Sequence, residues 1–554
     1  MINDVFTIII GGKAGQGTKK AGSVVAEIFA NKGRYVFEMD DYMSLIKGGH
    51  NFSSISTSNR WISSHYMKAD LIINLDKRSY DNHINHIAED CIMVNNSDEN
   101  YELEGINISM SSIAKNYPRP SLMLGVGAVA ILAASIGFGK NKLNNIIERE
   151  YPRGIEDNIS YANKIYDEIY PKIGGKFNLK DGDKKRTIIS GNQAIALGAI
   201  AGGLNTYFAY PMTPSSSILH YLASLAEDFR LAVVHPENEI AVINMAIGST
   251  YTGARAVIGT SGGGFALMEE GFSLAGMCEA PVLCILSMRP SPASGVPTYT
   301  GQSDLNFALN AGHGDFLRIV ASPSTIEEAY YLTSEMLELV WKFQTPGILL
   351  TEKHLSESFM SVDINLEKSK FPKPELHHEG SYKRYLNTTS GISPLLFPPS
   401  REMIHWNSYE HDEMGITTEN PEEITMMHNK RKRKSETINN YMENMKTINI
   451  YGKNEPIIFT WGSTTMSVLE ALKYGNIECT VIQPIYLSPL PIWNLKKFKN
   501  KDNIVVELNS TGQLASLLKS KVGITPQAEI NQYNGRPFDP IELSNILKEV
   551  IKNG

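Results

Sequence analysis

"YFAYPMTPSSSILHYL", residues 207–222, turns an apolar run into a helical pattern through Pro211 and Pro214. Proline fixes φ and biases the residue before it toward extended geometry, so the segment from Met212 to Pro214 is predicted to be a stiff corner. The three serines that follow suit the first turn of a helix. Such a corner would hold the Thr213 hydroxyl in one place. The alternative is an ordinary turn.

The bulk numbers describe a globular chain with several domains. Its 554 residues exceed what one core supports and predict about three or four domains. A hydrophobic content of 42% is typical of a soluble globular protein. A net charge of −7 argues against a nucleic-acid partner, with a local basic face as the alternative. None of the cysteines forms a Cys-x-x-Cys pair, which argues against an iron–sulfur cluster or a zinc ribbon and favours free thiols in a reducing cytoplasm. They are Cys91, Cys278, Cys284 and Cys479.

Neither of two apolar segments, 5–10 and 122–138, indicates a membrane protein. The first apolar run, 5–10, is short and lacks a basic segment before it, so no signal peptide is predicted. Residues 122–138, LMLGVGAVAILAASIGF, are a little short for a span and rich in glycine and alanine. We interpret them as a buried, closely packed helix and expect a cytoplasmic protein.

The order of apolar runs predicts an α/β fold with several doubly wound domains. "VFTIII" runs into a glycine loop and a helical pattern, and "RYVFE" and "LIINL" read as further parallel strands. A later series of strands is predicted at "AVVH", "ARAVIGT" and "PVLCILS", and a third at "PIIF", "CTVIQP" and "NIVVELN". The predicted units are a first α/β domain at 1–175, a charged linker at 176–187, a second α/β domain at 188–365, a connecting segment at 366–450 that wraps the surface or a partner, and a third α/β domain at 451–554.

The glycine loop GGKAGQG lies where a nucleotide loop is found, directly after the first strand. Glycines let backbone amides approach a phosphate, and a helix N-terminus favours an anion. The spacing matches neither the dinucleotide fingerprint nor the P-loop, because Thr18-Lys19 follows Gly17. Gly12, Gly15 and Gly17 are therefore candidates for a phosphate-binding loop, with a tight strand–helix turn as the alternative.

Two further segments carry candidate polar groups before small-residue helices. Glu237 and Glu239 precede the helix in "HPENEIAVINMAIGSTYTGARA", and a carboxyl group there suits proton sharing with a heterocycle. The alternative is helix capping by an acid in the first turn. "GTSGGGF", with Ser261 and Gly262, permits close approach of a flat or phosphorylated ligand, or is a glycine-rich turn.

The last candidates for functional residues are basic. Arg289 follows the strand "PVLCILS", at the edge where loops line the crevice of such folds, and suits a bidentate carboxylate partner. The alternative is a surface arginine. "NKRKRK", with Lys430 to Lys434 at its core, is interpreted as a solvated face.

The order of these motifs resembles that of the α subunits of 2-oxoacid:ferredoxin oxidoreductases. Tyr210-Pro211-Met212-Thr213-Pro214, the Glu239 helix, "TSGGG" and Arg289 with "PTYTGQSDLNFALNAGHGDF" follow one another as in that family. "GGKAGQG" and "YMSLIKGGHNFSSI" resemble its γ domain, fused ahead of α. "GSYKRYLNTTSGISPLLFPPS", "EHDEMG", "TWGSTTMSVLEALKYG" and "VVELNSTGQLASLL" extend the resemblance downstream.

The resemblance implies a role for each candidate residue. The three domains would be a γ-type domain associated with coenzyme A, a pyrimidine-binding domain for thiamine diphosphate, and a transketolase C-terminal-like domain. Glu239 would hydrogen-bond the aminopyrimidine ring, Thr213 would touch the substrate, and Arg289 would pair with the carboxylate of a 2-oxo acid. The cofactor-binding residues would be Tyr210, Pro211, Ser261 and Gly262, and the loop of Gly12, Gly15 and Gly17 would suit the phosphates of coenzyme A.

The same resemblance implies a second subunit. The chain has no Gly-Asp-Gly element followed by asparagine in a suitable context, and no cysteine cluster. In the family the Mg²⁺–diphosphate site and the [4Fe–4S] cluster lie on a β subunit, so this chain has no metal site of its own and is expected to be inactive alone. The expected assembly is αβ or (αβ)2, which converts a 2-oxo acid and coenzyme A to acyl-CoA and CO2 and passes electrons to ferredoxin.

Other functions remain open from the sequence. A coenzyme- or nucleotide-binding assembly protein with a degenerate thiamine domain is one, and a transketolase-like carboligase is another. Pyruvate, branched 2-oxo acids and 2-oxoglutarate are all candidate substrates, and the downstream motifs favour 2-oxoglutarate or broad 2-oxo acid use. Between Arg289 and Arg318 there is no other lysine or arginine to meet a second carboxylate.

Overall fold

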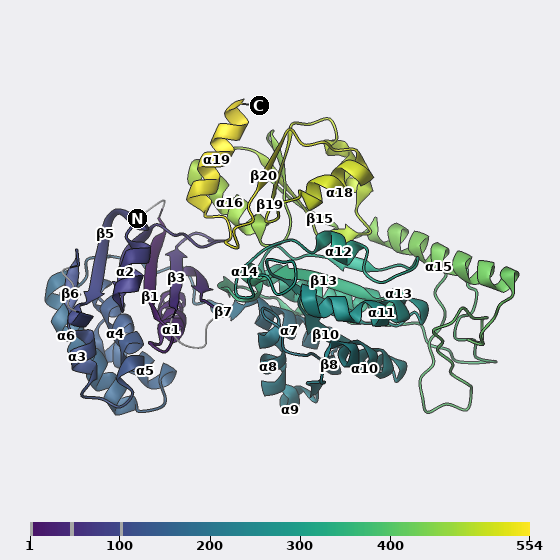
Figure 1. Ribbon diagram of the computed structural model, residues 1–554, viewed down its shortest axis with the longest axis horizontal. Helices are drawn as coiled ribbons and strands as arrows, with labels where there is room; N and C mark the ends of the chain where they lie inside the picture. Colours follow the sequence, from purple (N-terminus) through teal and green to yellow (C-terminus); the bar gives the residue numbers. More distant parts are fainter. Residues whose placement is uncertain (1–3, 45–48, 100–102, 554) are drawn as a thin grey trace.

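Three β-sheets, with helices packed around them, organise the computed structural model, which describes residues 4–44, 49–99 and 103–553 (Figure 1). The α/β class predicted from the sequence is confirmed. Part of the quoted segment "YMSLIKGGHNFSSI", residues 45–48, lies outside the described residues.

The first sheet has eight strands in the order β6-β5-β4-β1-β3-β2-β14-β7. β1 (Phe6–Lys13) is parallel to β4 (Ala69–Asn74), as predicted. β3 (His50–Ser58), which the sequence analysis did not identify, is antiparallel and lies between β1 and β2 (Tyr35–Asp41). β5 (Ile87–Asn96) and β6 (Ile106–Ile108) complete one edge.

Most helices of this first region pack on one face of β1, the face that carries Phe6, Ile8 and Ile10. The main ones are α1 (Thr18–Asn31), α4 (Pro120–Ser135) and α6 (Ile155–Ile173). α4 is the apolar segment from the sequence, and it is buried as predicted, from Met123 to its end. No helix in the described ranges is both long enough and apolar enough to cross a membrane. The shorter helices here are α2 (Lys77–His83), η1 (Ser97–Glu99), α3 (Met110–Ala114) and α5 (Lys140–Glu150).

Strands from both ends of the second predicted domain join the first sheet. β14 (Phe359–Val362) is antiparallel to β2, and β7 (Thr187–Ser190) is antiparallel to β14. The first sheet is therefore continuous with the chain that enters and leaves the second sheet. The domain boundaries proposed from the sequence stay a prediction.

The second sheet has seven strands in the order β18-β12-β13-β11-β10-β8-β9. Six of them run parallel to their neighbours. The seventh, β18 (Tyr486–Ser488), comes from the C-terminal region and pairs antiparallel with β12 (Ile319–Ala321). The others are β8 (Thr206–Phe208), β9 (Ala232–Val234), β10 (Ala256–Thr260), β11 (Leu283–Met288) and β13 (Gly347–Glu352).

Because these strands are parallel, their carboxyl ends meet at one edge of the second sheet. The long helices that pack on this sheet are α7 (Gly191–Ala201), α10 (Glu239–Tyr251), α11 (Gly262–Met277) and α13 (Ile326–Phe343). α10 follows β9 and α11 follows β10, so both helices begin at that edge. The shorter helices are α8 (Ser216–Ser224), α9 (Ala226–Phe229), α12 (Leu305–Leu309), α14 (Lys353–Ser356) and η2 (Leu366–Lys368).

The third sheet has five strands in the order β15-β17-β16-β19-β20, of which only β15 is antiparallel to its neighbour. Trp461 lies in one apolar cluster with residues of the second sheet, so the two regions share a core. The strands are β15 (Ile448–Tyr451), β16 (Ile457–Phe459), β17 (Thr480–Pro484), β19 (Asn503–Glu507) and β20 (Ala528–Asn531). The helices are α16 (Thr464–Gly475), α17 (Ile492–Leu495), η3 (Lys496–Phe498), α18 (Gln513–Val522) and α19 (Pro540–Asn553).

The connecting segment contains a long helix that the sequence analysis missed, α15 (Pro421–Met442). It lies at the end of the molecule opposite the first sheet (Figure 1). Its start has the usual signals, because the Asn420 side chain accepts a hydrogen bond from the Glu422 amide and Pro421 occupies the first turn.

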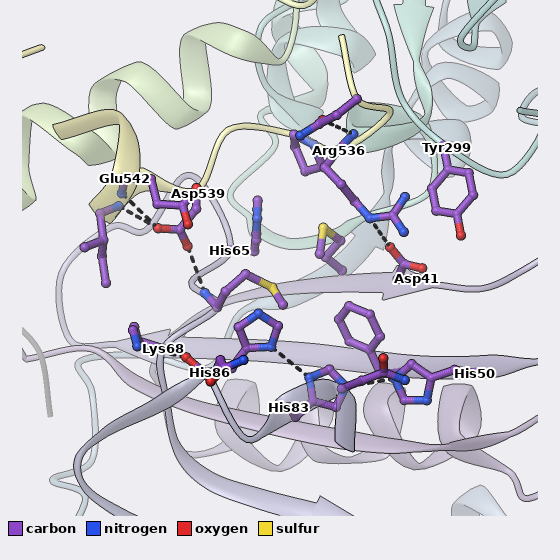
Figure 2. A pocket seen from close by; sticks show the side chains of 18 of the residues that line it. Asp41, His50, His65, Lys68, His83, His86, Tyr299, Arg536, Asp539 and Glu542 are labelled. Atoms are coloured by element: carbon purple, nitrogen blue, oxygen red, sulfur yellow. Dashed lines mark hydrogen bonds and ion pairs between the residues drawn. The ribbon is translucent and has the colours of Figure 1, made fainter. Parts of the chain in front are cut away.

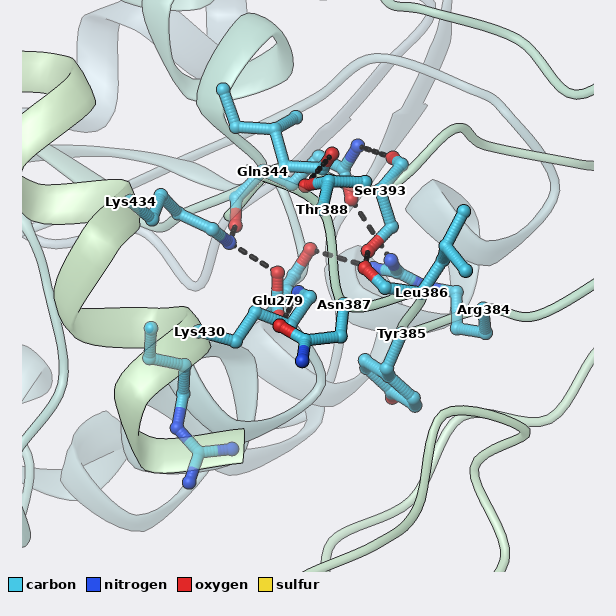
Figure 3. A network of polar contacts seen from close by, with 12 residues as sticks. Glu279, Gln344, Arg384, Tyr385, Leu386, Asn387, Thr388, Ser393, Lys430 and Lys434 are labelled. Carbon is cyan, nitrogen blue, oxygen red and sulfur yellow. Dashed lines mark hydrogen bonds and ion pairs between the residues drawn. The ribbon is translucent and has the colours of Figure 1, made fainter. Parts of the chain in front are cut away.

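The prediction that Lys430 to Lys434 form a solvated face is wrong for the two end residues. Lys430 and Lys434 are 0% and 2% exposed. Four residues apart on α15, they share one helix face and both form ion pairs with Glu279, just after α11 (Figure 3). Arg384 donates to the carbonyl oxygens of Cys278 and Glu279, at 2.9 and 3.0 Å. Buried charge thus joins the connecting segment to the far end of α11.

The cysteines agree with the sequence interpretation. All four are free thiols, and Cys278, Cys284 and Cys479 are buried. Burial raises the pKa of the Cys479 thiol to about 11, which makes it unreactive near neutral pH.

Candidate functional site

The corner after β8 is closed by its own hydrogen bonds. The Ser215 amide and hydroxyl both donate to Met212 O, each at 2.8 Å. Asn192 of α7 donates through Nδ2 to Pro214 O, also at 2.8 Å. α8 begins directly afterwards, at Ser216. The structure therefore has the strand–corner–helix arrangement that the prolines predict, with half-buried Thr213 at its tip.

Arg289 reaches this corner from the end of β11. Its Nη1 donates to Thr213 O at 3.0 Å. Partial burial lowers the pKa of the guanidinium, and the carboxyl group of Asp304 opposes that effect. Thr213 and Arg289, 76 residues apart in the chain, are thus in direct contact. The surface-arginine alternative does not describe this residue.

Glu239 begins α10 but does not cap it. The preceding residue, Asn238, accepts the hydrogen bond from Ala241 N at 3.0 Å. Glu239 is only 3% exposed, and its Oε1 is buried without a hydrogen-bond partner. Buried polar atoms are almost always paired, and an unpaired one costs about 1–3 kcal/mol. Asn238 therefore supplies the side-chain cap, and Glu239 is an acid of the first turn with one buried, unpaired oxygen. Its role toward a ligand stays a prediction.

The glycines at the start of α11 make room for this carboxyl group. A Cβ on Gly264 would lie 2.6 Å from Glu239 Oε1 and 2.2 Å from Thr260 Oγ1. At Gly263 the nearest atom to a Cβ would be 3.9 Å away. The third glycine of "SGGG" is therefore required by close packing, a role that the sequence analysis did not assign to it.

A second carboxyl group meets the same helix start. A Cβ on Gly262 would lie 2.5 Å from Asp304 Oδ2. Ser261, the residue that precedes α11, has a buried hydroxyl without a hydrogen-bond partner. Asp304 accepts a hydrogen bond from Ser291 Oγ at 3.3 Å, and burial raises its pKa to about 6. Asp304 was not predicted. Its only sequence signal is an acid in the loop after Arg289.

The structure therefore brings together the three residues predicted to be catalytic. Thr213 contacts Arg289, which interacts electrostatically with Asp304, and the start of α11 lies between Asp304 and Glu239. All of them follow carboxyl ends of strands in the second sheet. Tyr210, in the same corner, is 39% exposed. The binding roles given to Tyr210, Pro211, Ser261 and Gly262 remain predictions.

Three exposed apolar side chains lie on the helices that begin beside this site. Ile240 and Met245 of α10 and Leu267 of α11 are 54%, 47% and 54% exposed. They lie on the two helices that begin beside Glu239. A contiguous exposed apolar patch is typical of a protein–protein interface.

The glycine loop after β1 is partly explained by its own turn. A Cβ on Gly12 would lie 2.4 Å from Gln16 Oε1, which accepts from Lys13 N, and Gly17 has φ 77° against Gly125 of α4. Gly15 has φ 94° and no atom within 4 Å of a Cβ position, so its face is open. The tight-turn alternative accounts for Gly12 and Gly17, whereas Gly15 stays accessible to an anion.

A cavity of about 810 Å³ lies where the first sheet meets the C-terminal region (Figure 2). Three histidines form a chain of hydrogen bonds on one wall. His83 Nε2 lies 2.9 Å from His50 Nε2, and His83 Nδ1 lies 3.0 Å from His86 Nδ1. Burial lowers the pKa of each of these three histidines, so they are neutral near pH 7. On the opposite wall Arg536 pairs with Asp41 at 3.2 Å and stacks on Tyr299. Tyr299 belongs to the loop that links Arg289 to Asp304.

Metal ligands do not cluster in the described part of the chain. Across residues 4–44, 49–99 and 103–553, no group of three or more His, Cys, Asp or Glu side chains is placed to hold a metal ion.

Two family models match separate parts of this chain. Residues 197–430 match the family model described as pyruvate flavodoxin/ferredoxin oxidoreductase, thiamine diphosphate-binding. Residues 7–168 match the model described as pyruvate ferredoxin/flavodoxin oxidoreductase. The first match contains Thr213, Glu239 and Arg289, and the second contains the glycine loop.

Individual relatives match this chain over nearly its whole length or over a part of it. The 2-oxoacid:ferredoxin oxidoreductase subunit alpha of Sulfolobus sp. is 30% identical, over 99% of this chain and 97% of its own. A 2-oxoglutarate synthase subunit KorA of Archaeoglobus fulgidus is 40% identical over 31% of this chain and 50% of its own. The structure of 2-oxoglutarate:ferredoxin oxidoreductase from Magnetococcus marinus superimposes with a TM-score of 0.91 at 27% identity, over 99% of this chain and 100% of that one. The chain therefore belongs to the 2-oxoacid:ferredoxin oxidoreductase family, as an α subunit.

Proposed function

We propose that this chain and a β subunit together catalyse the thiamine diphosphate-dependent oxidative decarboxylation of a 2-oxo acid to acyl-CoA and CO2, with ferredoxin as electron acceptor. The observation that carries the proposal is the buried, unpaired Glu239 Oε1, which lies with the Thr213–Arg289 contact at the carboxyl ends of the second sheet, within the segment matched by the thiamine diphosphate-binding model.

The residues present fit the pyrimidine half of thiamine diphosphate. Glu239 Oε1 is buried and unpaired, and Gly264 leaves the space beside it free of a side chain. A buried carboxyl group of this kind can hold or release a proton on a ring nitrogen. Ser261, Gly262 and the Tyr210-Pro211 corner would line the same side of the cofactor. When bound, thiamine diphosphate supplies the electron sink that decarboxylation of a 2-oxo acid requires.

Arg289 and Thr213 would orient the substrate. Nη1 of Arg289 is engaged by Thr213 O, which leaves Nε and Nη2 to donate to a carboxylate. A guanidinium that pairs with a carboxylate in this way fixes both position and orientation. The closed corner at 210–215 keeps the Thr213 hydroxyl in place before substrate arrives, which lowers the entropy cost of reaching the reactive geometry.

The β subunit would supply what this chain lacks. We place the Mg²⁺–diphosphate site and the [4Fe–4S] cluster on β, in an αβ or (αβ)2 assembly located in the cytoplasm. The relatives named as α subunits support a second chain, and so does the exposed apolar surface of Ile240, Met245 and Leu267 beside Glu239. A β subunit docked there would complete the site and exclude water from it.

Coenzyme A would enter from the side of the first sheet. The Magnetococcus relative was described with coenzyme A and succinyl-CoA bound. In this chain the cavity of Figure 2 reaches the Arg289–Asp304 loop through Tyr299, so an acceptor there would approach the substrate site. The open face at Gly15 remains the candidate for its phosphates.

The substrate is proposed to be 2-oxoglutarate or a range of 2-oxo acids. The relatives that act on 2-oxoglutarate support this choice. A second carboxylate would need a cation from outside residues 290–317, which contain no lysine or arginine, and β is the natural source.

The test is reconstitution. The purified chain with thiamine diphosphate is expected to show no turnover of pyruvate, 2-oxoglutarate or branched 2-oxo acids until its β subunit is added. Addition of β is expected to give coenzyme A-dependent reduction of ferredoxin. Turnover by this chain without β would refute the division of labour between the two subunits.

A further inference from the structure

Asp304 has an unusual environment for a residue at the start of a helix. It precedes α12, where aspartate normally accepts a hydrogen bond from the first turn, but its side chain makes no such bond. It turns instead toward the start of α11, with Oδ2 against Gly262. The fold therefore uses this carboxyl group for something other than capping.

The carboxyl group is buried and only half satisfied. Asp304 is 7% exposed, its Oδ1 accepts from Ser291 Oγ at 3.3 Å, and its Oδ2 is buried without a hydrogen-bond partner. Arg289 acts on it electrostatically, yet among the described residues Arg289 donates no hydrogen bond to Asp304, and Oδ2 stays without a partner. A carboxyl group that stays near a guanidinium without pairing leaves that guanidinium free for another anion.

We propose that Asp304 is a positioning residue of the substrate site, and that the carboxylate of a 2-oxo acid binds to Arg289 preferentially when Asp304 is protonated. This inference rests on the proposed function, because it concerns the binding of the 2-oxo acid substrate to Arg289. Substrate binding would then take up one proton from solvent onto an Asp304 oxygen. The neutral acid would keep its hydrogen bond with Ser291 and gain an O–H donor.

The charges around Asp304 set the direction of this coupling. Burial already raises its pKa to about 6, and Arg289 together with the hydroxyls of Ser291 and Ser303 opposes that rise. Gln513 of α18, which binds Ser303 O, is neutral. The other carboxyl group at the start of α11 is Glu239, beside Gly264. A second carboxylate on Arg289 would raise the pKa of Asp304 further, because like charges disfavour ionisation.

The experiment measures KM and kcat of the α–β complex for its best 2-oxo acid from pH 5.5 to 8. For wild type, KM is expected to be constant below about pH 6, where Asp304 is protonated, and to rise by up to tenfold per pH unit above it. Asp304→Asn, which mimics the protonated acid, is expected to flatten this rise. Its KM at pH 8 should be several-fold lower than that of wild type. Asp304→Glu is expected to restore a pH-dependent KM.

The outcomes separate this inference from the proposed function. An Asp304→Asn complex whose KM rises with pH as steeply as wild type would overturn it, as would a higher KM at every pH, which indicates a structural role only. If Asp304→Asn does not assemble with β, the wild-type and Asp304→Glu complexes still test the proposal. A wild-type KM that does not change with pH would overturn the proposal, and a KM that rises with pH in both complexes would support it. A complex that turns over no 2-oxo acid would refute the proposed function instead.

Discussion

Replacement of Glu279 by glutamine is predicted to loosen the connecting segment without touching the substrate site. Glu279 is 2% exposed and is the anion for both Lys430 and Lys434. The Lys430 pair has an N–O distance of 2.7 Å, and Lys434 also donates to Gln344 O at 3.0 Å. Without the carboxylate, two buried ammonium groups share only neutral oxygens.

The expected cost follows from that burial. Removing one partner of a buried ion pair typically costs about 3–5 kcal/mol, because the remaining charge stays desolvated. Since 1.36 kcal/mol corresponds to a factor of ten, the opening equilibrium of α15 should increase roughly 10²- to 10⁴-fold. Glu436→Gln, an exposed change on the same helix, is expected to alter it by less than about 0.5 kcal/mol.

Amide hydrogen exchange measures this opening region by region, so it does not require two-state unfolding of a chain with several domains. Protection in α15 and at the end of α11 should fall in Glu279→Gln and remain high in Glu436→Gln. The double variant Glu279→Gln/Lys434→Met should recover part of the loss, because an apolar side chain replaces a buried charge. Unchanged protection in Glu279→Gln would refute the reasoning.

The pH dependence has a definite sign. Burial lowers the pKa of Lys434 to about 7, below the value of about 10.4 in an unfolded chain. Between these values the unfolded state binds more protons, so the stability of this region should rise from pH 7 to pH 10. Glu279 raises the pKa of Lys434, so its removal should extend the rise to lower pH. A profile that falls with pH in this range would contradict the assignment.

Three further predictions concern the site. Arg289→Lys keeps the positive charge but loses the planar guanidinium that donates two parallel hydrogen bonds. The kcat/KM of the α–β complex should therefore fall about 10- to 100-fold, the cost of one charge-assisted hydrogen bond. Unchanged kinetics would contradict the role of Arg289 in binding the substrate carboxylate. Gly264→Ala places a Cβ 2.6 Å from Glu239 Oε1 and should weaken thiamine diphosphate binding at least tenfold by calorimetric titration, whereas Gly263→Ala, with 3.9 Å of space, should not. Met245→Glu should weaken association with β at least tenfold in sedimentation experiments, and undiminished association would place the interface elsewhere.

The sequence predicted the strands and glycine loops well because their signals are local. The apolar runs that end at Phe208, Thr260 and Met288 are strands of one parallel sheet. The corner and the helix starts after them follow from proline and glycine stereochemistry. β3 escaped prediction because its residues 50–58, HNFSSISTS, are rich in serine, and only their place between two strands buries them.

The sequence could name candidate residues of the site but not their arrangement in space. The contact of Arg289 with Thr213 O spans 76 positions, and no local pattern announces it. Glu239 is free because Asn238 takes over the capping, a detail that depends on backbone geometry. Asp304 was missed because its position before a short helix is the ordinary place for a capping acid.

The basic run NKRKRK, residues 429–434, shows where a local pattern gave a wrong prediction. Its charge density is typical of a solvated helix, and the acids close to it in the sequence, such as Glu436, are not the partners of Lys430 and Lys434. The partner, Glu279, lies 151 residues earlier than Lys430. Tertiary structure alone makes Lys430 and Lys434 interior residues. The helix that carries them could have been found from Asn420, Pro421 and the two glutamates that follow.

The central claim is that Glu239 of this chain acts on a thiamine cofactor completed by a second subunit. The most direct measurement is turnover of the reconstituted complex with Glu239→Ala, beside Glu237→Ala, an exposed neighbour two residues away. We predict that Glu239→Ala assembles with β but loses turnover by roughly 10²- to 10⁴-fold, as expected for removal of a proton-transfer group, whereas Glu237→Ala keeps it. Wild-type turnover by Glu239→Ala would contradict the account and favour a coenzyme-binding assembly protein with a degenerate thiamine domain.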